Sequence, residues 1–214
     1  EVEQQNWLKT GQAELNDVMR GEQNVALLAR QIITSLAEYL DAQVGLLYVT
    51  EEHGGQLSLQ LAGSYAYTAR KGHRNTFKFG EGLVGQAALE QQSLLFSELP
   101  EGYILITSGI GEMTPQNILV TPFIYDGEVK GVIELGTIHT FNELHREFLK
   151  LACENIAIAV HTAQSRVRMQ QLLDETQRQT QELQFQQNQL AKSNKELEDQ
   201  ARVLQESEEK LRVQ

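Results

Sequence analysis

Residues 118–136, ILVTPFIYDGEVKGVIELG, contain two apolar runs that meet at the pair Asp126-Gly127. An Asp-Gly pair between β-branched and aromatic residues is typical of a tight hairpin turn, because both residues tolerate the positive φ angles of such a turn. With a two-residue loop, the pairs that face each other are Tyr125 with Glu128 and Pro122 with Gly131. The stretch therefore predicts a buried antiparallel hairpin.

The second strand of this hairpin should present two different faces, because side chains alternate along a strand. One face carries Gly131, Ile133 and Leu135, and the other carries Val132, Glu134 and Gly136. Glu134 is unusual in an apolar strand, where a buried carboxylate must pair with a donor or rise in pKa. Two interpretations follow: Glu134 recognises a ligand in a pocket, or its strand face is partly wet.

The chain has 214 residues, a formal net charge of −11 and one cysteine, Cys153. Its length predicts one domain of moderate size plus an extended segment. The negative charge argues against nucleic-acid binding, and the short basic run 70–74 is interpreted as a solvated loop. One cysteine excludes an internal disulfide and a multi-thiolate metal site, and it indicates a reducing compartment. No apolar run is long enough to span a membrane, and a chain that begins with Glu1 is expected to be an excised piece or a processed chain.

Two rows of mostly apolar residues, spaced by multiples of seven, run between Trp7 and Tyr39. They are Val18, Val25, Ile32 and Tyr39, and Leu8, Leu15, Ala29 and Leu36. This spacing predicts a helix with a coiled-coil seam that is looser or broken near Gly21.

Short strand-like segments follow this helical region. Residues 44–50 predict a buried strand, and an alternating row from Leu57 to Tyr67 after the turn at Gly54-Gly55 predicts its hairpin partner. Residues 77–79 predict another short strand, and residues 86–91 predict a helix.

The turn before that helix, residues 80–85 (GEGLVG), matches the dinucleotide-binding pattern G-x-G-x-x-G. The neighbouring hairpins do not supply the βαβ crossover of a nucleotide-binding unit, so a tight turn is the main interpretation and nucleotide binding the minor one. Residues 97–118 are irregular, with a short strand at 103–107 and a loop at 108–111. They are either a ligand lid or a connector that packs its own apolar residues.

A long helix is predicted at the C-terminal end. Thr140 and Glu143 fit a capping box, and neither Gly nor Pro follows them. An apolar face for packing on the sheet is formed by Leu144, Phe148, Leu151 and Ala159. Farther on, a leucine row with a spacing of seven lies beside a mostly polar row of Thr180, Gln187, Asn194, Ala201 and Glu208. This pattern predicts a weak parallel dimer seam whose register is set by polar residues.

Taken together, these elements resemble a GAF domain over about residues 25–162. The resemblance is carried by residues 42–48 (AQVGLLY), the Gly-rich turn 80–85, and residues 122–127 and 131–135 of the central hairpin. The flanking segments, residues 7–16 and 172–177, resemble the helices that join HAMP, GAF and kinase parts in membrane-anchored hybrid sensor histidine kinases.

The resemblance implies an α+β, PAS-like fold: a six-stranded antiparallel sheet with the N- and C-terminal helices on one face and a small-molecule pocket on the other. Ile133 and Leu135 should then face the helices, and Val132 and Glu134 the pocket. The expected ligand-binding residues are Tyr65, Tyr67, Phe79, Tyr103, Ser108, Gly109, Thr121, Val132 and Glu134.

The chain departs from several activities of the family that it resembles. Bilin-binding members have a cysteine near the pocket, cyclic-nucleotide members have an Asn-Lys-Phe-Asp-Glu type of motif, and methionine-sulfoxide-reducing members use several cysteines. None of these features is present here. We therefore expect no covalent bilin and no metal, and a ligand that is unidentified or absent. The five histidines are scattered, so no catalytic residue is assigned.

The sequence thus predicts a signalling helix at 1–24, a GAF sensor domain at 25–162 and a coiled-coil signalling helix at 163–214. The expected function is a sensory module of a histidine kinase, which relays a small-molecule or upstream signal through a parallel homodimer. The alternative is a dimerisation and transmission spacer that binds no ligand. The dimer seam would comprise Leu183, Leu190, Asn194, Leu197, Leu204 and Leu211. The expected location is cytoplasmic, in a parent anchored in the inner membrane with upstream HAMP or transmembrane segments and a downstream kinase.

Overall fold

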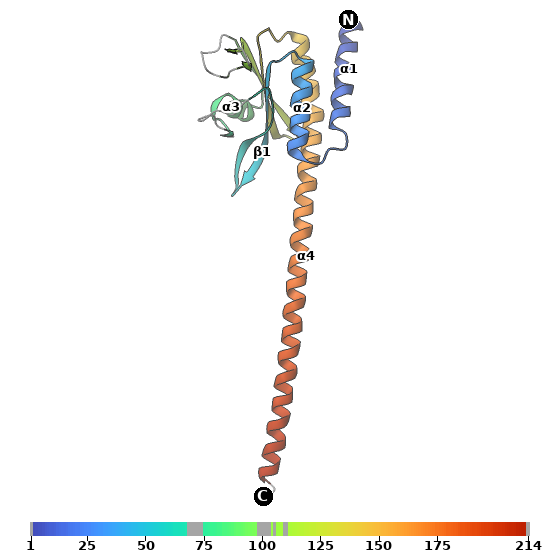
Figure 1. Ribbon diagram of the computed structural model, residues 1–214, viewed down its shortest axis with the longest axis vertical. Helices are drawn as coiled ribbons and strands as arrows, with labels where there is room; N and C mark the ends of the chain where they lie inside the picture. Colours follow the sequence, from blue (N-terminus) through green and yellow to red (C-terminus); the bar gives the residue numbers. More distant parts are fainter. Residues whose placement is uncertain (1, 68–74, 98–103, 105, 109–110, 213–214) are drawn as a thin grey trace. The chain divides into compact units, whose positions relative to one another are not determined.

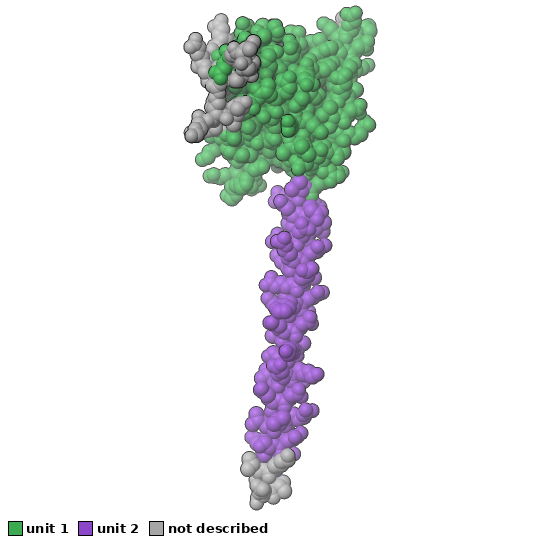
Figure 2. Space-filling view, viewed as in Figure 1, with its two compact units in different colours: residues 1–166 green, residues 167–214 purple. Residues whose placement is uncertain are grey.

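The computed structural model describes residues 2–67, 75–97, 104, 106–108 and 111–212. The chain divides into two compact units, residues 1–166 and 167–214, which Figure 2 colours separately. Unit 1 contains an α+β domain, and unit 2 contains the remainder of the last helix. The basic run 70–74, Tyr103 and Gly109 lie outside the described residues.

A six-stranded antiparallel sheet forms the centre of unit 1, in the order β3-β2-β1-β8-β7-β4. The six strands are β1 (Val44–His53), β2 (Gln56–Tyr65), β3 (Thr76–Lys78), β4 (Leu94–Ser97), β7 (Asn117–Tyr125) and β8 (Glu128–Thr137). The predicted fold class is therefore confirmed. The row that was expected to run on to Tyr67 ends as a strand at Tyr65.

A separate two-stranded sheet pairs β5 (Ile106–Ser108) with β6 (Gly111–Met113). The prediction of a loop over residues 108–111 was wrong at both ends, because Ser108 and Gly111 are paired in this hairpin. Backbone pairing between the two segments outweighs the loop character of the Gly/Ser-rich sequence.

The helices are α1 (Val2–Met19), α2 (Val25–Tyr39), α3 (Gly82–Glu90) and α4 (Glu143–Arg212). Figure 1 shows α2 and the part of α4 within unit 1 on one face of the sheet, and α3 on the other. α3 begins four residues earlier than predicted, inside the Gly-rich segment.

Each face of the sheet has its own apolar core. Ile133 and Leu135 pack with residues of α2 and α4, whereas Val132 packs with Val84 and Ala87 of α3. The alternation predicted for β8 is confirmed by this division, because neighbouring residues of one strand belong to opposite cores.

The central hairpin has the predicted tight turn, with positive φ angles at Asp126 (52°) and Gly127 (76°) and with Tyr125 opposite Glu128. The predicted pairing of Pro122 with Gly131 was wrong. Pro122 lies opposite Val132, because a β-bulge makes Lys130 an extra residue in β8 and shifts the register by one.

The N-terminal region is not one helix with a coiled-coil seam. The break predicted near Gly21 is confirmed (φ 80°), and Asn24 caps α2 by accepting the Leu27 N–H at 3.0 Å. The apolar rows are used inside the domain instead: Leu15, Ala29, Ile32 and Leu36 are buried in its core. The apolar rows with heptad-like spacing are therefore buried by packing within a single chain, in a hairpin formed by α1 and α2.

The capping box predicted at Thr140 was displaced by two residues. Asn142 caps α4 instead, because its Oδ1 accepts the His145 N–H at 2.8 Å. Of the apolar face predicted for the first turns, Phe148 is fully buried, while Leu144, Leu151 and Ala159 are half-buried. The buried face is formed by Phe148, Leu149, Ala152, Cys153, Ile156, Ala157, Val160 and Ala163.

Candidate functional site

The α3 side of the central strands carries the candidate site. In the sheet register, Glu134 of β8 lies opposite Leu46 of β1 and Val120 of β7. One row farther along, Val132 lies between Tyr48 and Pro122. Leu46, Tyr48 and Val120 were not predicted as site residues, because the strand pairing that brings them beside Glu134 is not visible in their own segments.

Glu134 is a buried acid. Its side chain is 6 % exposed, and burial raises its pKa from the ordinary 4.5 to about 7. The carboxyl group therefore changes charge near neutral pH, in surroundings that disfavour the charged form. The alternative that this strand face is partly wet does not agree with such burial.

Tyr67 lies close enough to Glu134 to be affected by its charge. The pKa of the Tyr67 phenol is raised, first by burial and second by the negative charge of Glu134. Tyr67 and Phe79 both pack against the apolar core on the α3 side, as do Phe77 and the ring of Tyr48, which meet edge to face at 5.5 Å. Aromatic side chains and one titratable carboxyl group thus gather on this face.

Two predicted site residues do not belong to this face. Tyr65 packs against the core on the helix side, and it pairs with Gly45, whose missing Cβ points toward Ile33 of α2. Thr121 pairs with Ile133 and shares the helix-side face of β7 with it. Both positions were placed wrongly because a side chain's face depends on strand register, which their local sequence does not fix.

The remaining predicted residues are divided. Val132 and Glu134 lie together with Tyr67 and Phe79 on the α3 side. Ser108 ends β5 in the small second sheet, and Tyr103 and Gly109 lie outside the described residues.

An open groove lies at the edge of the sheet, between the first turns of α2 and the second half of β2. Ala26, Leu27 and Arg30 line it on the helix side, and residues 61–64 line it on the strand side. Tyr67 also borders the groove, so the aromatic group on the α3 face reaches this edge.

The Gly-rich turn has a geometric role. The Gly80 N–H donates to the Gly85 carbonyl at 2.7 Å, and a Cβ on Gly85 would come within 2.2 Å of the Lys78 carbonyl oxygen. The described strands around the turn pair in antiparallel fashion, and among them there is no parallel crossover of a nucleotide-binding unit. These contacts favour the interpretation of a tight turn that starts α3.

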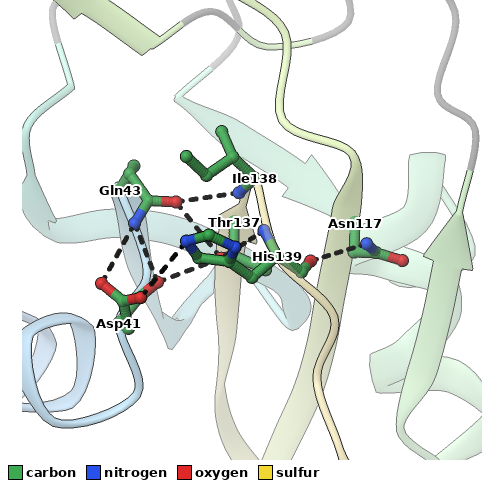
Figure 3. Close-up of polar contacts among 6 residues, drawn as sticks. All are labelled: Asp41, Gln43, Asn117, Thr137, Ile138 and His139. Atoms are coloured by element: carbon green, nitrogen blue, oxygen red, sulfur yellow. Dashed lines mark hydrogen bonds and ion pairs between the residues drawn. The ribbon is translucent and has the colours of Figure 1, made fainter.

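Polar side chains join the ends of the helix layer to the sheet (Figure 3). The Thr137 hydroxyl donates to the Asp41 carbonyl at 3.0 Å, and Gln43 Nε2 donates to the same carbonyl at 2.9 Å. Asn117 Nδ2 donates to the His139 carbonyl at 2.7 Å. The loop after α2 and the segment before α4 are thereby fastened to one end of the sheet.

An aromatic group holds α1 against the domain. The ring of Trp7 stacks on Tyr39 at 4.7 Å and meets Phe148 edge to face at 5.4 Å, and the Tyr39 hydroxyl donates to the Trp7 carbonyl at 2.6 Å. His145 lies beside Trp7 at 5.8 Å, and within the described residues its buried Nδ1 has no hydrogen-bond partner. Burial lowers the pKa of His145, with an opposing effect from Asp41.

Cys153 lies in the buried face of α4, on the opposite side of the sheet from Glu134. Burial raises the pKa of its thiol to about 12. Because the thiolate is the reactive form, burial and the raised pKa disfavour reaction at this cysteine in the folded domain. Within the described residues, no group of three or more metal-ligating side chains is found, and no helix is long and apolar enough to cross a membrane.

The predicted seam residues of α4 are described as far as Leu204. Leu183, Leu190, Leu197 and Leu204 are each 59–63 % exposed, and Asn194 is exposed as well. The Leu211 side chain lies outside the described side chains.

Solved structures with the same fold include GAF domains and a GAF-fold enzyme. The GAF domain of a phosphoenolpyruvate-protein phosphotransferase from Coxiella burnetii has a TM-score of 0.62 at 18 % identity, covering 75 % of this chain and 96 % of that one. The free methionine-R-sulfoxide reductase of Neisseria meningitidis, in complex with its substrate, has a TM-score of 0.59 at 16 % identity, covering 74 % and 91 %. The A. aeolicus nlh2 GAF domain in an inactive state has a TM-score of 0.56 at 19 % identity, covering 74 % and 98 %.

At these identities the likeness shows the fold alone. A comparison with curated proteins gives no match. The family model described as GAF domain matches residues 22–161, which is most of the chain and agrees closely with the extent of the resemblance in the sequence. This chain therefore belongs to the GAF domain family, a family of regulatory and sensory modules.

Proposed function

We propose that this chain is the sensory module of a longer signalling protein, and that it relays a small-molecule or upstream signal through a parallel dimeric coiled coil to a histidine kinase core. The observation that carries the proposal is the double use of α4. Its residues Phe148, Ile156 and Val160 are part of the buried domain core, whereas its leucines from Leu183 to Leu204 are exposed. A helix that is shared in this way can transmit a change in the domain to a partner segment.

The helix that packs against the leucine row is proposed to be α4 of a second copy of the chain. Four leucines at a spacing of seven, each more than half exposed, form a stripe that soluble proteins cover. In a two-stranded coiled coil each leucine would insert between four residues of the facing helix. This arrangement supports the proposed homodimer.

Threonines near the seam support the same arrangement. Thr176 lies in the leucine row and Thr180 in the companion row, and their hydroxyls donate to the Leu172 and Thr176 carbonyls at 2.7 and 2.8 Å. A hydroxyl that is already bonded within its own helix leaves no unsatisfied donor when it is buried. These positions can therefore enter a dimer seam at little cost.

The positions beside the seam are almost free of charge. They are Gln179, Gln186, Ser193 and Gln200 on one side, and Gln184, Ala191, Glu198 and Gln205 on the other. In a parallel pair these positions face each other, so two copies meet without like-charge repulsion. Because charge does not fix the register, Asn194 and Gln187 in the companion row are proposed to do so, with a modest preference that a signal can shift.

The ligand is proposed to bind on the α3 side of the sheet. Val132, Tyr67 and Phe79 supply apolar and aromatic surface there, and Glu134 supplies a buried carboxyl group. A ligand with a hydrogen-bond donor or a positive charge would satisfy Glu134, which otherwise loses solvation on folding. The position of Cys153 on the opposite face supports a ligand that is bound without a covalent thiol link.

The kinase context rests on the segments that flank the domain. Residues 7–16 and 172–177 resemble the helices on either side of GAF domains in hybrid sensor histidine kinases. The proposed parent is anchored in the inner membrane, with its GAF domain in the cytoplasm.

The dimer is tested with one seam variant and one matched control. Leu190 and Phe185 are equally exposed at 63 %, but Phe185 lies on the far side of the helix from the seam. Leu190→Lys should convert a dimer to a monomer in analytical ultracentrifugation, because it buries a charge in the seam, and Phe185→Lys should leave the mass unchanged. A monomeric parent chain, or equal effects of the two variants, would contradict the seam.

The ligand is tested by a thermal-shift screen of small metabolites with the full chain. A ligand present at about 100 times its Kd adds about 2.7 kcal/mol to the free energy of unfolding, which is a rise of several degrees in Tm. If no compound stabilises the chain while the dimer persists, the alternative of a dimerisation and transmission spacer is favoured instead.

A further inference from the structure

The turn between β7 and β8 is held from both faces of the sheet. On the α3 side, Gln91 ends the helix and its Nε2 donates to the Gly127 carbonyl at 3.3 Å. On the helix side, the ring of Tyr125 stacks on His161 of α4 at a centroid distance of 4.5 Å and an interplanar angle of 22°. The short turn therefore connects the end of α3 with the part of α4 near the end of unit 1.

A second connection joins the same part of α4 to the same turn. Gln164 Nε2 donates to the Thr50 carbonyl of β1 at 3.0 Å, and the Thr50 hydroxyl donates to the Val129 carbonyl at 2.7 Å. Val129 is the second residue of β8. His161 and Gln164, one helical turn apart, are thus both attached to the start of β8.

The β7–β8 turn is short and is closed by local contacts. Asp126 and Gly127 have the paired positive φ angles of a two-residue hairpin turn, and Lys130, the extra residue of the bulge, pairs with Glu128 at 2.6 Å. A two-residue turn closed by a bulge and an ion pair has few alternative conformations. Such a turn is suited to pass a displacement on one side of the sheet to the other.

We infer that the β7–β8 turn, residues 125–129, is the link through which a change on the α3 face alters the attachment of α4 at His161 and Gln164. The inference deepens the proposed sensory function and rests on it for its biological meaning. β8 itself carries Val132 and Glu134 only a few residues after the turn, so the candidate ligand face and the link belong to one strand.

The link is tested without a ligand, in the full chain, by hydrogen–deuterium exchange of α4. Gln91→Asn shortens the side chain by one methylene so that it no longer reaches Gly127, while asparagine tolerates the left-handed conformation of this position (φ 54°). Gln86→Asn is the matched control, since Gln86 lies on the same helix and bonds to Glu90 instead of the turn.

Gln91→Asn should raise the exchange rate of amides 158–166 about threefold, the effect of losing one modest hydrogen bond, and Gln86→Asn should not. In a Tyr125→Leu background, where the stacking contact is lost and only the Gln164–Thr50–Val129 connection remains, Gln91→Asn should cause a smaller further rise than in the parent chain. This non-additivity is the signature of a shared link.

The inference is overturned if Gln91→Asn leaves α4 exchange unchanged, or if its effect in the Tyr125→Leu background is as large as in the parent chain. A rise that α2 shares equally also overturns it, because such a rise reflects a general loss of stability. The expected change depends neither on added ligand nor on dimer formation, so its failure differs from a negative thermal-shift screen or a monomeric mass.

Discussion

Glu134 lies directly opposite Leu46 across the β1–β8 ladder, so a carboxyl group faces an aliphatic side chain in the interior of the sheet. On its other side the neighbour in register is Val120. A polar group in this position ties the stability of the domain to its own protonation.

Glu134→Gln should change how stability depends on pH. Burial raises the folded-state pKa of Glu134 from 4.5 to about 7, so between these values the folded chain holds a proton that the unfolded chain has released. The contribution of Glu134 to the free energy of unfolding is fully present below pH 4.5 and is lost as the pH rises through about 7. A neutral glutamine does not undergo this loss. Between pH 5 and pH 8, the free energy of unfolding of the variant should therefore rise relative to that of the parent chain, by up to about 3 kcal/mol.

Denaturant unfolding at a series of pH values measures this difference. Glu147→Gln, at an exposed position of α4, is the matched control and should follow the parent chain. A Glu134→Gln variant with the same pH dependence as the parent would show that the carboxyl group is charged and solvated in the folded state.

Gly11→Ala should loosen α1 from the domain. A Cβ at this position would lie 2.3 Å from the Tyr39 ring and 2.7 Å from the Phe148 ring, so the aromatic group around Trp7 must shift. We expect a loss of about 1–3 kcal/mol in the free energy of unfolding. Trp7 is the single tryptophan of the chain, so its fluorescence emission should move to longer wavelength.

Thr10→Ala, at the exposed neighbouring position, is the control for Gly11→Ala and should leave the Trp7 emission unchanged. Unaltered emission in Gly11→Ala as well would mean that α1 does not pack on the domain through this contact.

Asn142→Ala should destabilise the domain by about 1 kcal/mol, the usual effect of losing an N-cap side chain. The Asn142 Oδ1 accepts the His145 N–H at the start of α4, whereas Thr140 lies two residues before that cap. Thr140→Ala should therefore have little effect. If Thr140→Ala destabilised the domain more than Asn142→Ala in urea unfolding, the capping box expected from the sequence would be supported instead.

Asn194→Leu should strengthen the proposed dimer. Replacing a polar companion-row residue with leucine removes the desolvation cost at the seam, and we expect the dimer Kd to fall about tenfold. Asn188→Leu, at an exposed position outside both rows, should leave the Kd unchanged. Equal effects of the two variants in sedimentation equilibrium would indicate nonspecific apolar association instead.

The predicted site residues differ in how well their strand face could be predicted from the sequence. Period-two alternation in β8 correctly separated Val132 and Glu134 from Ile133 and Leu135, because both pairs belong to one strand. Thr121 and Tyr65 were assigned to the wrong face because their position depends on pairing with another strand. A single bulge at Lys130 was enough to move Pro122 from Gly131 to Val132.

Contacts between distant segments carried no signal in the sequence. Gln91, Tyr125 and His161 are unremarkable in their own segments, and only the folded chain brings them to the two sides of one turn. The heptad spacing before Tyr39 was misleading for a related reason. Amphipathic helices that pack within one domain and helices that form a dimer have nearly the same period, so spacing alone does not tell which partner buries the apolar face.

The sequence by itself determined the central hairpin turn, the alternation of β8, the break near Gly21, the presence of a long uninterrupted C-terminal helix and the family. These features depend on local backbone preference and on periodicity within one segment. Tertiary structure alone decided the face of Thr121, the packing of α1 back against the domain, and the burial that places the pKa of Glu134 near neutral. Register, packing partner and desolvation are set by segments far apart in the chain, so no single stretch contains them.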